Sequence, residues 1–285
     1  MMLWHQPVID RLAQLQNAQL LPHAIGLVCP PGWGLEILTE QVVRQVLALQ
    51  SDLSPRDAAH HDLLWVEAEK ASITVDQIRA LRDFAVQTAQ LGERKVAVVY
   101  AADKLNVNAA NALLKVLEEP PPGTHVLLCT ERWSRLLPTV RSRTQRFSVH
   151  ADWHAASSWL QAQGVVVDDA VIAELGQAPL SITDKSEPEV DRWLQNLSMG
   201  TYHQAVAAVA KDAHADWLAR WYRLILQRLR LAGDLSGGYH RNLFAFADQL
   251  LNARRQLLYT NGANGQLLLE QLSYQWLQIQ ARPSA

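Results

Sequence analysis

Four short, almost continuously apolar runs alternate with amphipathic segments in the first half of this chain, and this pattern constrains its fold most. The runs predict strands at 24–29, 62–67, 95–100 and 125–130. Between them, helical patterns cover 35–50, 74–89 and 108–119. Apolar runs without in–out alternation are typical of strands buried on both faces of a parallel sheet. The order therefore predicts a doubly wound α/β domain over residues 1–150.

The pattern changes after residue 150, where helical periodicity replaces the strand-like runs. Segments at 152–163, 168–176 and 179–185 predict three short helices, and 186–188 predicts a linker. The sequence from 189 to 281 has a helical pattern throughout. A chain of 285 residues has room for two or three domains of about 100–200 residues. We therefore expect a small helical lid at 151–187 and a larger helical bundle at 188–285.

Composition excludes several classes of protein. A hydrophobic content of 49% with 19% charged residues excludes a disordered chain. The net charge of −2 argues against a protein that coats nucleic acid by bulk charge. Two cysteines, Cys29 and Cys129, exclude a disulfide scaffold and a four-cysteine zinc site. No apolar run approaches the ~18 residues of a membrane span, and the start has no leader pattern, so we expect a cytoplasmic protein.

The cysteines and tryptophans are expected to be packing residues. Cys29 and Cys129 fall at the ends of two predicted strands that can be neighbours, and buried thiols suit a reducing compartment. Trp217 and Trp221 are four residues apart and share one helix face. A place at a subunit interface is the alternative for some of the tryptophans.

A glycine turn between the first strand and the first helix has the context of a phosphate-binding loop, G-x-x-x-x-G-K-[ST]. Gly34 matches the last glycine of the pattern, and Gly32 also allows a tight turn. The lysine position holds Leu35, and the hydroxyl position holds Glu36. Glu36 puts a carboxylate where an anionic phosphate would meet the helix N-terminus. The loop is degenerate, or it is an ordinary turn.

The second part of a nucleotide site, an acidic pair at the end of a later strand, is also missing. The strand at 95–100 ends in Tyr100 and Ala101. Asp103 comes two or three residues too late and precedes Lys104, so we expect a surface aspartate paired with that lysine. A chain with this sequence is expected neither to bind Mg·ATP well nor to hydrolyse it.

The segment 108–146 carries a family resemblance. Its pieces are Asn-Ala-Leu-Leu-Lys at 111–115, Leu-Glu-Glu-Pro-Pro at 117–121 and Leu-Leu-Pro-Thr-Val-Arg-Ser-Arg at 136–143. With Gly-Gln-Ala-Pro-Leu at 176–180, they resemble the clamp-loader subunits of bacterial DNA polymerase III, δ′ and γ/τ. The resemblance covers 1–150 closely and 151–186 less closely. Beyond that it rests on helical character.

The resemblance implies an AAA+ P-loop domain, a lid and a collar that forms a ring. The γ/τ motor subunits keep Lys-Thr and Asp-Glu where this chain has Leu35, Glu36, Tyr100 and Ala101, and their lid arginine falls near Ser181 here. The chain therefore resembles δ′, the non-hydrolysing stator of a five-subunit loader with γ/τ and δ. That loader opens the sliding clamp and places it on primed DNA. ATP is then bound by neighbouring subunits, and any polymerase activity belongs to the holoenzyme.

The triplet Ser142-Arg143-Thr144 stands where the family has Ser-Arg-Cys. The resemblance implies that Arg143 is an arginine finger supplied in trans to a neighbour's ATP, because a guanidinium stays charged and binds phosphate bidentately. The surrounding segment 131–146 holds five arginines against one acid, a local excess of +4. The alternative is a solvated basic face. Direct DNA contact is expected to be weak and confined to such patches.

The four-cysteine zinc module that the family usually carries is missing from 51–61, so we expect no zinc. His60, His61 and Asp62 are the remaining candidate ligands there, but adjacent side chains of an extended segment point to opposite faces. Two other functions remain open. One is an active AAA+ ATPase with a variant site, and the other is an adaptor unrelated to replication.

Overall fold

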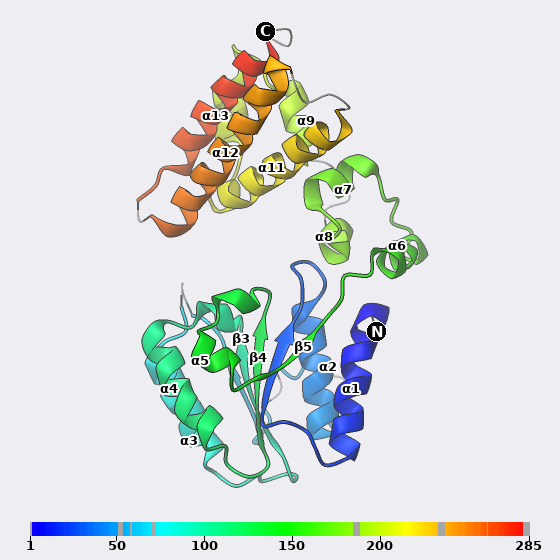
Figure 1. The fold of residues 1–285 in the computed structure, drawn as a ribbon, viewed down its shortest axis with the longest axis vertical. Coiled ribbons are helices and arrows are strands. Elements are labelled where there is room, and N and C mark those ends of the chain that lie inside the picture. The colour runs from blue at the N-terminus through cyan, green and yellow to red at the C-terminus, as the bar shows by residue number, and fades with distance from the viewer. Residues whose placement is uncertain are drawn as a thin grey trace. The chain divides into compact units, whose positions relative to one another are not determined.

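A computed structural model describes residues 2–50, 54–57, 59–69, 72–184, 189–232, 237–260 and 262–281. The chain divides into two compact units, Met1–Trp159 and Leu160–Ala285 (Figure 1). The helix α6 (Trp153–Ala162) contains the boundary. The predicted linker at 186–188 lies outside the described residues, and the division into three domains stays a prediction.

The first unit contains a five-stranded sheet in the order β2-β3-β4-β1-β5, and all of its strand pairs are parallel. The strands are β1 (Ala24–Val28), β2 (Leu63–Val66), β3 (Lys95–Tyr100), β4 (Thr124–Thr130) and β5 (Gln145–Ser148). The four predicted strands are confirmed to within two residues at each end. Sequence analysis missed β5, because an edge strand of four residues with one buried side chain has no apolar run.

Helices cover both faces of the sheet, as Figure 1 shows, with α1 and α2 on one side and α3 and α4 on the other. The bounds are α1 (Gln6–Asn17), α2 (Leu35–Leu47), α3 (Val75–Ala85), α4 (Val107–Glu118) and α5 (Pro138–Arg141), with 3-10 turns η1 (Leu3–His5), η2 (Ala102–Lys104) and η3 (Trp133–Arg135). Asn106 caps α4 through the Ala109 N–H. This double cover explains why every residue of β1 and β4 is buried.

Gly26 of β1 lets an aromatic side chain lie directly on the sheet. A Cβ atom at this position would stand 2.6 Å from Cζ3 of Trp133 and 3.1 Å from Cγ2 of Thr144. Trp133 and Thr144 flank α5 on its two sides in the sequence. The missing side chain therefore fixes how close the segment with Arg143 comes to the sheet.

The second unit consists of helices. Beyond α6 they are α7 (Asp169–Leu175), α8 (Pro179–Asp184), α9 (Glu189–Asn196), α10 (Tyr202–Ala207), η4 (Lys211–Ala213), α11 (His214–Leu231), α12 (Gly238–Tyr259) and α13 (Gly265–Gln280). Trp221, Phe246 and Trp276 form the aromatic centre of its core, with ring centroids 5.2–6.0 Å apart. The prediction that Trp221 packs in a core is confirmed, because its side chain is fully buried.

A buried charge network ties α7 to α9 and α11 within this unit. Glu174 is fully buried, and its Oε2 accepts the N–H groups of Val190 and Asp191 at 2.9 and 3.2 Å. Arg220, 4% exposed, pairs with Glu174, Glu189 and Asp216. The network satisfies backbone donors at the start of α9 and fixes α7 on α11.

Candidate functional site

The degenerate loop after β1 is held closed by the N-terminal segment. Gly32 and Gly34 have left-handed φ values of 74° and 89°, which glycine adopts without strain. Trp33 lies between them and is buried. Trp4 Nε1 and His5 Nε2 donate to its carbonyl at 3.0 and 2.8 Å. The loop is thus a packed turn whose aromatic side chain points into the protein.

The first turn of α2 offers no cation to a phosphate group. Leu35 is buried in the core. Glu36 pairs with Arg56 at 2.6 Å, and Arg56 also pairs with Glu67 at 2.7 Å. The guanidinium that pairs with Glu36 is therefore shared between two carboxylates, and Glu36 keeps a carboxylate in the first turn of the helix, where an anionic phosphate would bind.

The carboxyl ends of β3 and β4 carry groups that are already engaged. Tyr100 stacks on Trp65 with ring centroids 5.7 Å apart, and burial raises the pKa of its phenol to about 12. Ala101 has a left-handed φ of 51°. The structure gives Asp103 a different partner from the expected lysine, because its carboxylate accepts the Thr130 hydroxyl at 2.8 Å. No carboxylate pair of a nucleotide site stands at Tyr100 and Ala101.

The triplet 142–144 follows α5 and presents its middle residue outward. Thr144 is buried and donates its hydroxyl to the Val140 carbonyl at 2.8 Å. Ser142 is exposed and donates to the Thr139 carbonyl at 3.0 Å. The Arg143 side chain between them is 38% exposed. Its guanidinium donates to the Thr139 carbonyl at 3.1 Å and pairs with Glu118 at 2.7 Å.

The predicted residues have different partners in the structure. The Glu36 charge helps to keep the pKa of Tyr100 high, after the larger effect of burial. Arg143 pairs with Glu118 at the end of α4. Sequence analysis missed Arg56 and Glu118 as partners of these residues. The two adjacent glutamates of the motif at 117–121 could have indicated an acidic partner for Arg143.

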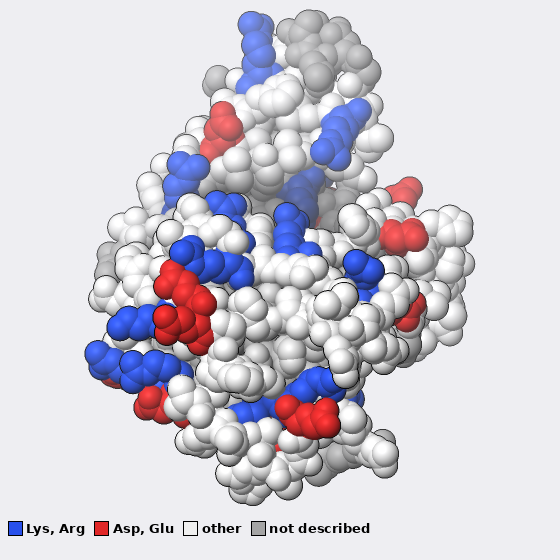
Figure 2. Space-filling model, turned by 60° about the horizontal axis from the view of Figure 1, so that its bottom comes forward, with Lys and Arg blue, Asp and Glu red and all other residues white. Residues whose placement is uncertain are grey.

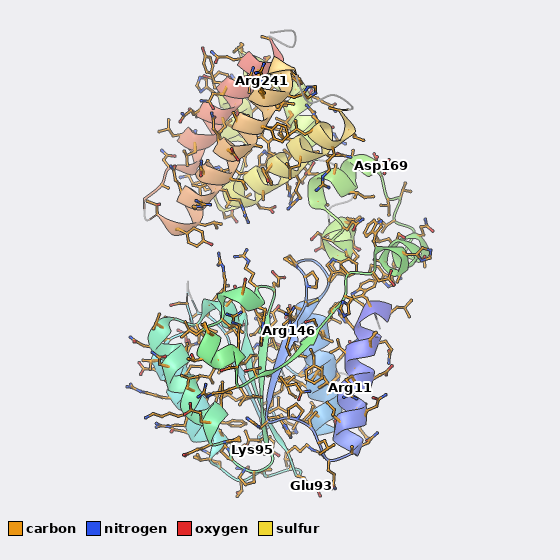
Figure 3. The ribbon with its side chains drawn as sticks, in the orientation of Figure 1. Arg11, Glu93, Lys95, Arg146, Asp169 and Arg241 are labelled. Carbon is orange, nitrogen blue, oxygen red and sulfur yellow. The ribbon has the colours of Figure 1, made fainter. Side chains whose placement is uncertain are left out.

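Four of the five arginines in the basic segment line one cleft of about 530 Å³ at the β1–β5 edge of the sheet. They are Arg132, Arg135, Arg141 and Arg146, and Glu131 is the acid among the lining residues. Arg146, labelled in Figure 3, places its guanidinium 5.7 Å from the centre of the Trp133 ring. Blue and red side chains are interspersed on the face that Figure 2 presents, so a continuous basic surface is not seen there.

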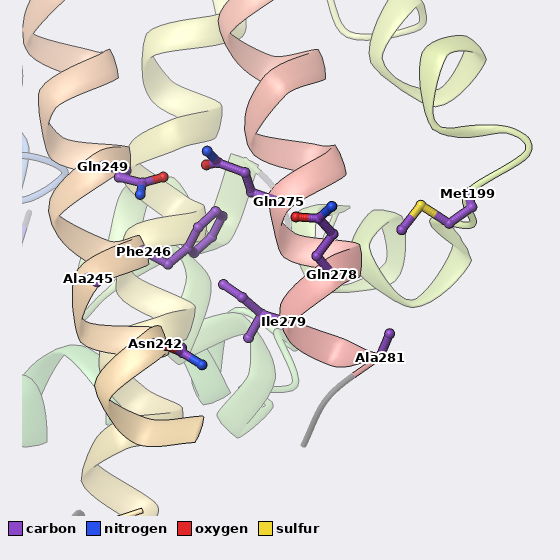
Figure 4. A pocket seen from close by; sticks show the side chains of 9 residues that line it. All are labelled: Met199, Asn242, Ala245, Phe246, Gln249, Gln275, Gln278, Ile279 and Ala281. Atoms are coloured by element: carbon purple, nitrogen blue, oxygen red, sulfur yellow. The ribbon is translucent and has the colours of Figure 1, made fainter. Parts of the chain in front are cut away.

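The second unit holds an uncharged cavity of about 560 Å³ between α12 and α13 (Figure 4). Amide side chains share its lining with Phe246, Ile279 and Met199, and they are Asn242, Gln249, Gln275 and Gln278. The lining offers no general base, nucleophile or metal ligand.

The candidate metal ligands have other contacts. His60 Nδ1 accepts the Asp62 N–H at 3.1 Å. The Asp62 carboxylate accepts the N–H groups of Gln90 and Leu91 at 2.8 and 2.7 Å. Within the described ranges, no three His, Cys, Asp or Glu side chains gather closely enough to hold a metal ion. Likewise, none of the described helices is both long and apolar enough to cross a bilayer.

The two cysteines are buried and free, and burial raises the pKa of each thiol to about 12. Cys29 directly follows β1, and Cys129 is the next-to-last residue of β4, so the two cysteines lie at the ends of neighbouring strands as predicted. Both thiols therefore stay protonated and act as small apolar groups.

Comparison with known proteins decides the family. Residues 4–152 match the family model described as DNA polymerase III, delta subunit. The DNA polymerase III subunit delta′ of Pseudomonas aeruginosa is 31% identical over 97% of each chain. The chain belongs to the DNA polymerase III delta prime family. The delta′ subunit of Escherichia coli is 27% identical over 94% of this chain and 93% of its own length.

A comparison with solved structures concerns the fold. A DNA polymerase III gamma subunit-related protein of Thermotoga maritima superposes with a TM-score of 0.59, over 95% of this chain and 98% of its own. At 17% identity this likeness concerns the fold alone. The predicted class, a parallel P-loop sheet domain followed by helices, is confirmed.

Proposed function

We propose that this chain is the stator of a clamp loader. It takes its place in a ring of five subunits with γ/τ and δ, and it helps to put the sliding clamp on primed DNA without hydrolysing ATP. The observation that carries the proposal is the start of α2, where Leu35 is buried and Glu36 is paired with Arg56. A delta prime family member without a phosphate-binding cation contributes architecture rather than hydrolysis.

Arg143 is the residue through which the stator acts on its neighbour. It lies two residues beyond the end of α5, with its guanidinium partly exposed. An arginine finger in trans is worth roughly 10³–10⁵ in rate at the site it serves. In the reconstituted loader, Arg143→Ala is expected to preserve assembly and to lower DNA-stimulated ATP hydrolysis about tenfold or more. Arg79→Ala, which removes an exposed arginine of α3, is the control. An unchanged rate for Arg143→Ala would refute the role.

Nucleotide titration separates the stator from an active ATPase with a variant site. The purified chain is expected to show no micromolar binding of Mg·ATP, because Glu36 repels the phosphates and Leu35 replaces the cation. Saturation in the micromolar range would favour the ATPase instead. Co-purification with γ/τ and δ distinguishes a loader subunit from an unrelated adaptor.

The proposed stator binds no structural zinc. The four-cysteine module implied by the resemblance does not fit this chain, because its two cysteines are both buried in the sheet unit. Four-coordinate structural zinc needs four protein ligands. Metal analysis of the purified chain is expected to find well under one zinc per molecule.

Direct contact with DNA is confined to the arginine cleft in this proposal. Three to four phosphate contacts on a single strand give a salt slope of roughly −2 to −3 in log K against log salt concentration. Fluorescence anisotropy with a short single strand measures this slope. Arg146→Gln is expected to reduce it by about 0.7, and Arg79→Gln is expected to leave it unchanged.

A further inference from the structure

The Arg143 guanidinium is held by three acceptors in this chain. Nη2 pairs with Glu118 Oε1 at 2.7 Å. Nη1 donates to the Thr139 carbonyl at 3.1 Å and to the Ser142 hydroxyl at 3.3 Å. Two of the acceptors belong to the segment of Arg143 itself, and Glu118 comes from another helix. The arginine is thus oriented before any neighbour is present.

We propose that Glu118 is the positioning residue for Arg143. Its carboxylate keeps the guanidinium in one orientation until a neighbour's phosphate replaces the carboxylate. This inference rests on the proposed function, in which Arg143 reaches a neighbour's ATP. An arginine side chain has much rotamer freedom, and orienting it in advance lowers the entropy that is lost on contact. Glu118 does not itself touch the nucleotide.

The strength of the pair suits such a role. The side chains of Arg143 and Glu118 are 38% and 47% exposed, so their ion pair is weak and salt-screened. A terminal phosphate carries more charge and offers two oxygens to the fork of the guanidinium. The phosphate therefore displaces the carboxylate, and the carboxylate does not trap the arginine.

The carboxyl end of α4 also attracts the Arg143 guanidinium electrostatically. Glu118 is the last residue of this twelve-residue helix, whose carboxyl end carries a partial negative charge. Glu119, the next residue, has left the helical conformation with φ −125° and ψ 69°. It is exposed, has the same charge and stands beside Glu118 in sequence. Glu119 is therefore a matched control.

The test uses the loader reconstituted from this chain with γ/τ and δ, and it measures ATP hydrolysis in the presence of clamp and primed DNA. Glu118→Ala is expected to lower kcat roughly two- to fivefold, the range of an exposed ion pair. KM for ATP is expected to stay constant, since the nucleotide is bound by the neighbour. Glu118→Gln keeps an acceptor oxygen and is expected to lose less. Glu119→Ala is expected to match the wild type.

The double variant Glu118→Ala/Arg143→Ala shows whether Glu118 acts through Arg143. Its rate is expected to equal that of Arg143→Ala alone. A further loss in the double variant, or equal rates for Glu118→Ala and Glu119→Ala, would overturn the positioning role while the arginine finger stands. If Arg143→Ala leaves hydrolysis unchanged, the proposed function fails first, and the inference fails with it.

Discussion

Replacing Arg220 by Met tests the buried charge network of the second unit. The substitution preserves length and apolar packing and removes the guanidinium, which is 4% exposed. The Glu174 carboxylate then loses its ion pair, stays fully buried and keeps its two backbone donors, Val190 N–H and Asp191 N–H. A more distant positive charge remains on Arg223, which donates to the Glu174 main-chain carbonyl at 2.6 Å. Breaking a buried pair from one side costs about 3–5 kcal/mol.

Two features of the network bear on this magnitude. Glu189 and Asp216, the other partners of Arg220, are 45% and 57% exposed and are resolvated when the arginine is removed. The Glu174 carboxylate alone stays buried without its ion pair, and the charge of Arg223 still acts on it, which favours the lower half of the range, about 3–4 kcal/mol. In a helical unit of this size, that corresponds to a fall in Tm on the order of 10 °C.

The assay is thermal and urea unfolding followed by tryptophan fluorescence and far-UV circular dichroism. Arg79→Met is the control, since it breaks an exposed ion pair with Asp76 that is worth about 0–1 kcal/mol. Glu174→Gln in the Arg220→Met background is expected to recover part of the loss, because the uncompensated charge is removed. An Arg220→Met loss no larger than that of Arg79→Met would refute the reasoning.

Three further outcomes are expected. Gly26→Ala is expected to destabilise the chain by about 1–3 kcal/mol in urea unfolding, because its Cβ would stand 2.6 Å from the Trp133 ring. Gly92→Ala is the control: a Cβ there would meet nothing within 4 Å, so stability is expected to change by less than about 0.5 kcal/mol. Burial lowers the pKa of His5 below its usual 6.5, so the imidazole takes up a proton in the unfolded chain first, and stability falls as pH drops below about 6.5. Between pH 7.5 and 5.5, the free energy of unfolding of the His5→Gln variant is therefore expected to change less than that of the wild type. An equal change in the two proteins would contradict this. The double variant Leu35→Lys/Glu36→Thr, which restores the phosphate-binding loop residues, is expected not to hydrolyse ATP in a phosphate-release assay, because the strand-end carboxylates are still missing. Hydrolysis by this variant would contradict the interpretation that carboxylates at the positions of Tyr100 and Ala101 are needed.

The elements with strong local signals were predictable from sequence. The strands β1, β3 and β4 are buried on both faces, and such strands appear as apolar runs. The start of α4, predicted at residue 108, is correct to within one residue, and Asn106 caps the helix there. The strand β5 was not readable, because only Phe147 of its four residues is buried. Its pairing with β1 depends on a chain segment more than a hundred residues away.

By itself, the sequence determined the class of this protein, and it showed that Leu35, Glu36, Tyr100 and Ala101 stand where a nucleotide site would have Lys-Thr and Asp-Glu. The tertiary structure alone decided the partners of the charged groups. Arg56 meets Glu36, Asp103 meets Thr130, and Arg143 meets Glu118. These pairs join residues 20 to 27 positions apart, which meet only after helices and strands have packed. Charge–charge contacts fall off with distance in space, and spacing along a chain does not determine that distance.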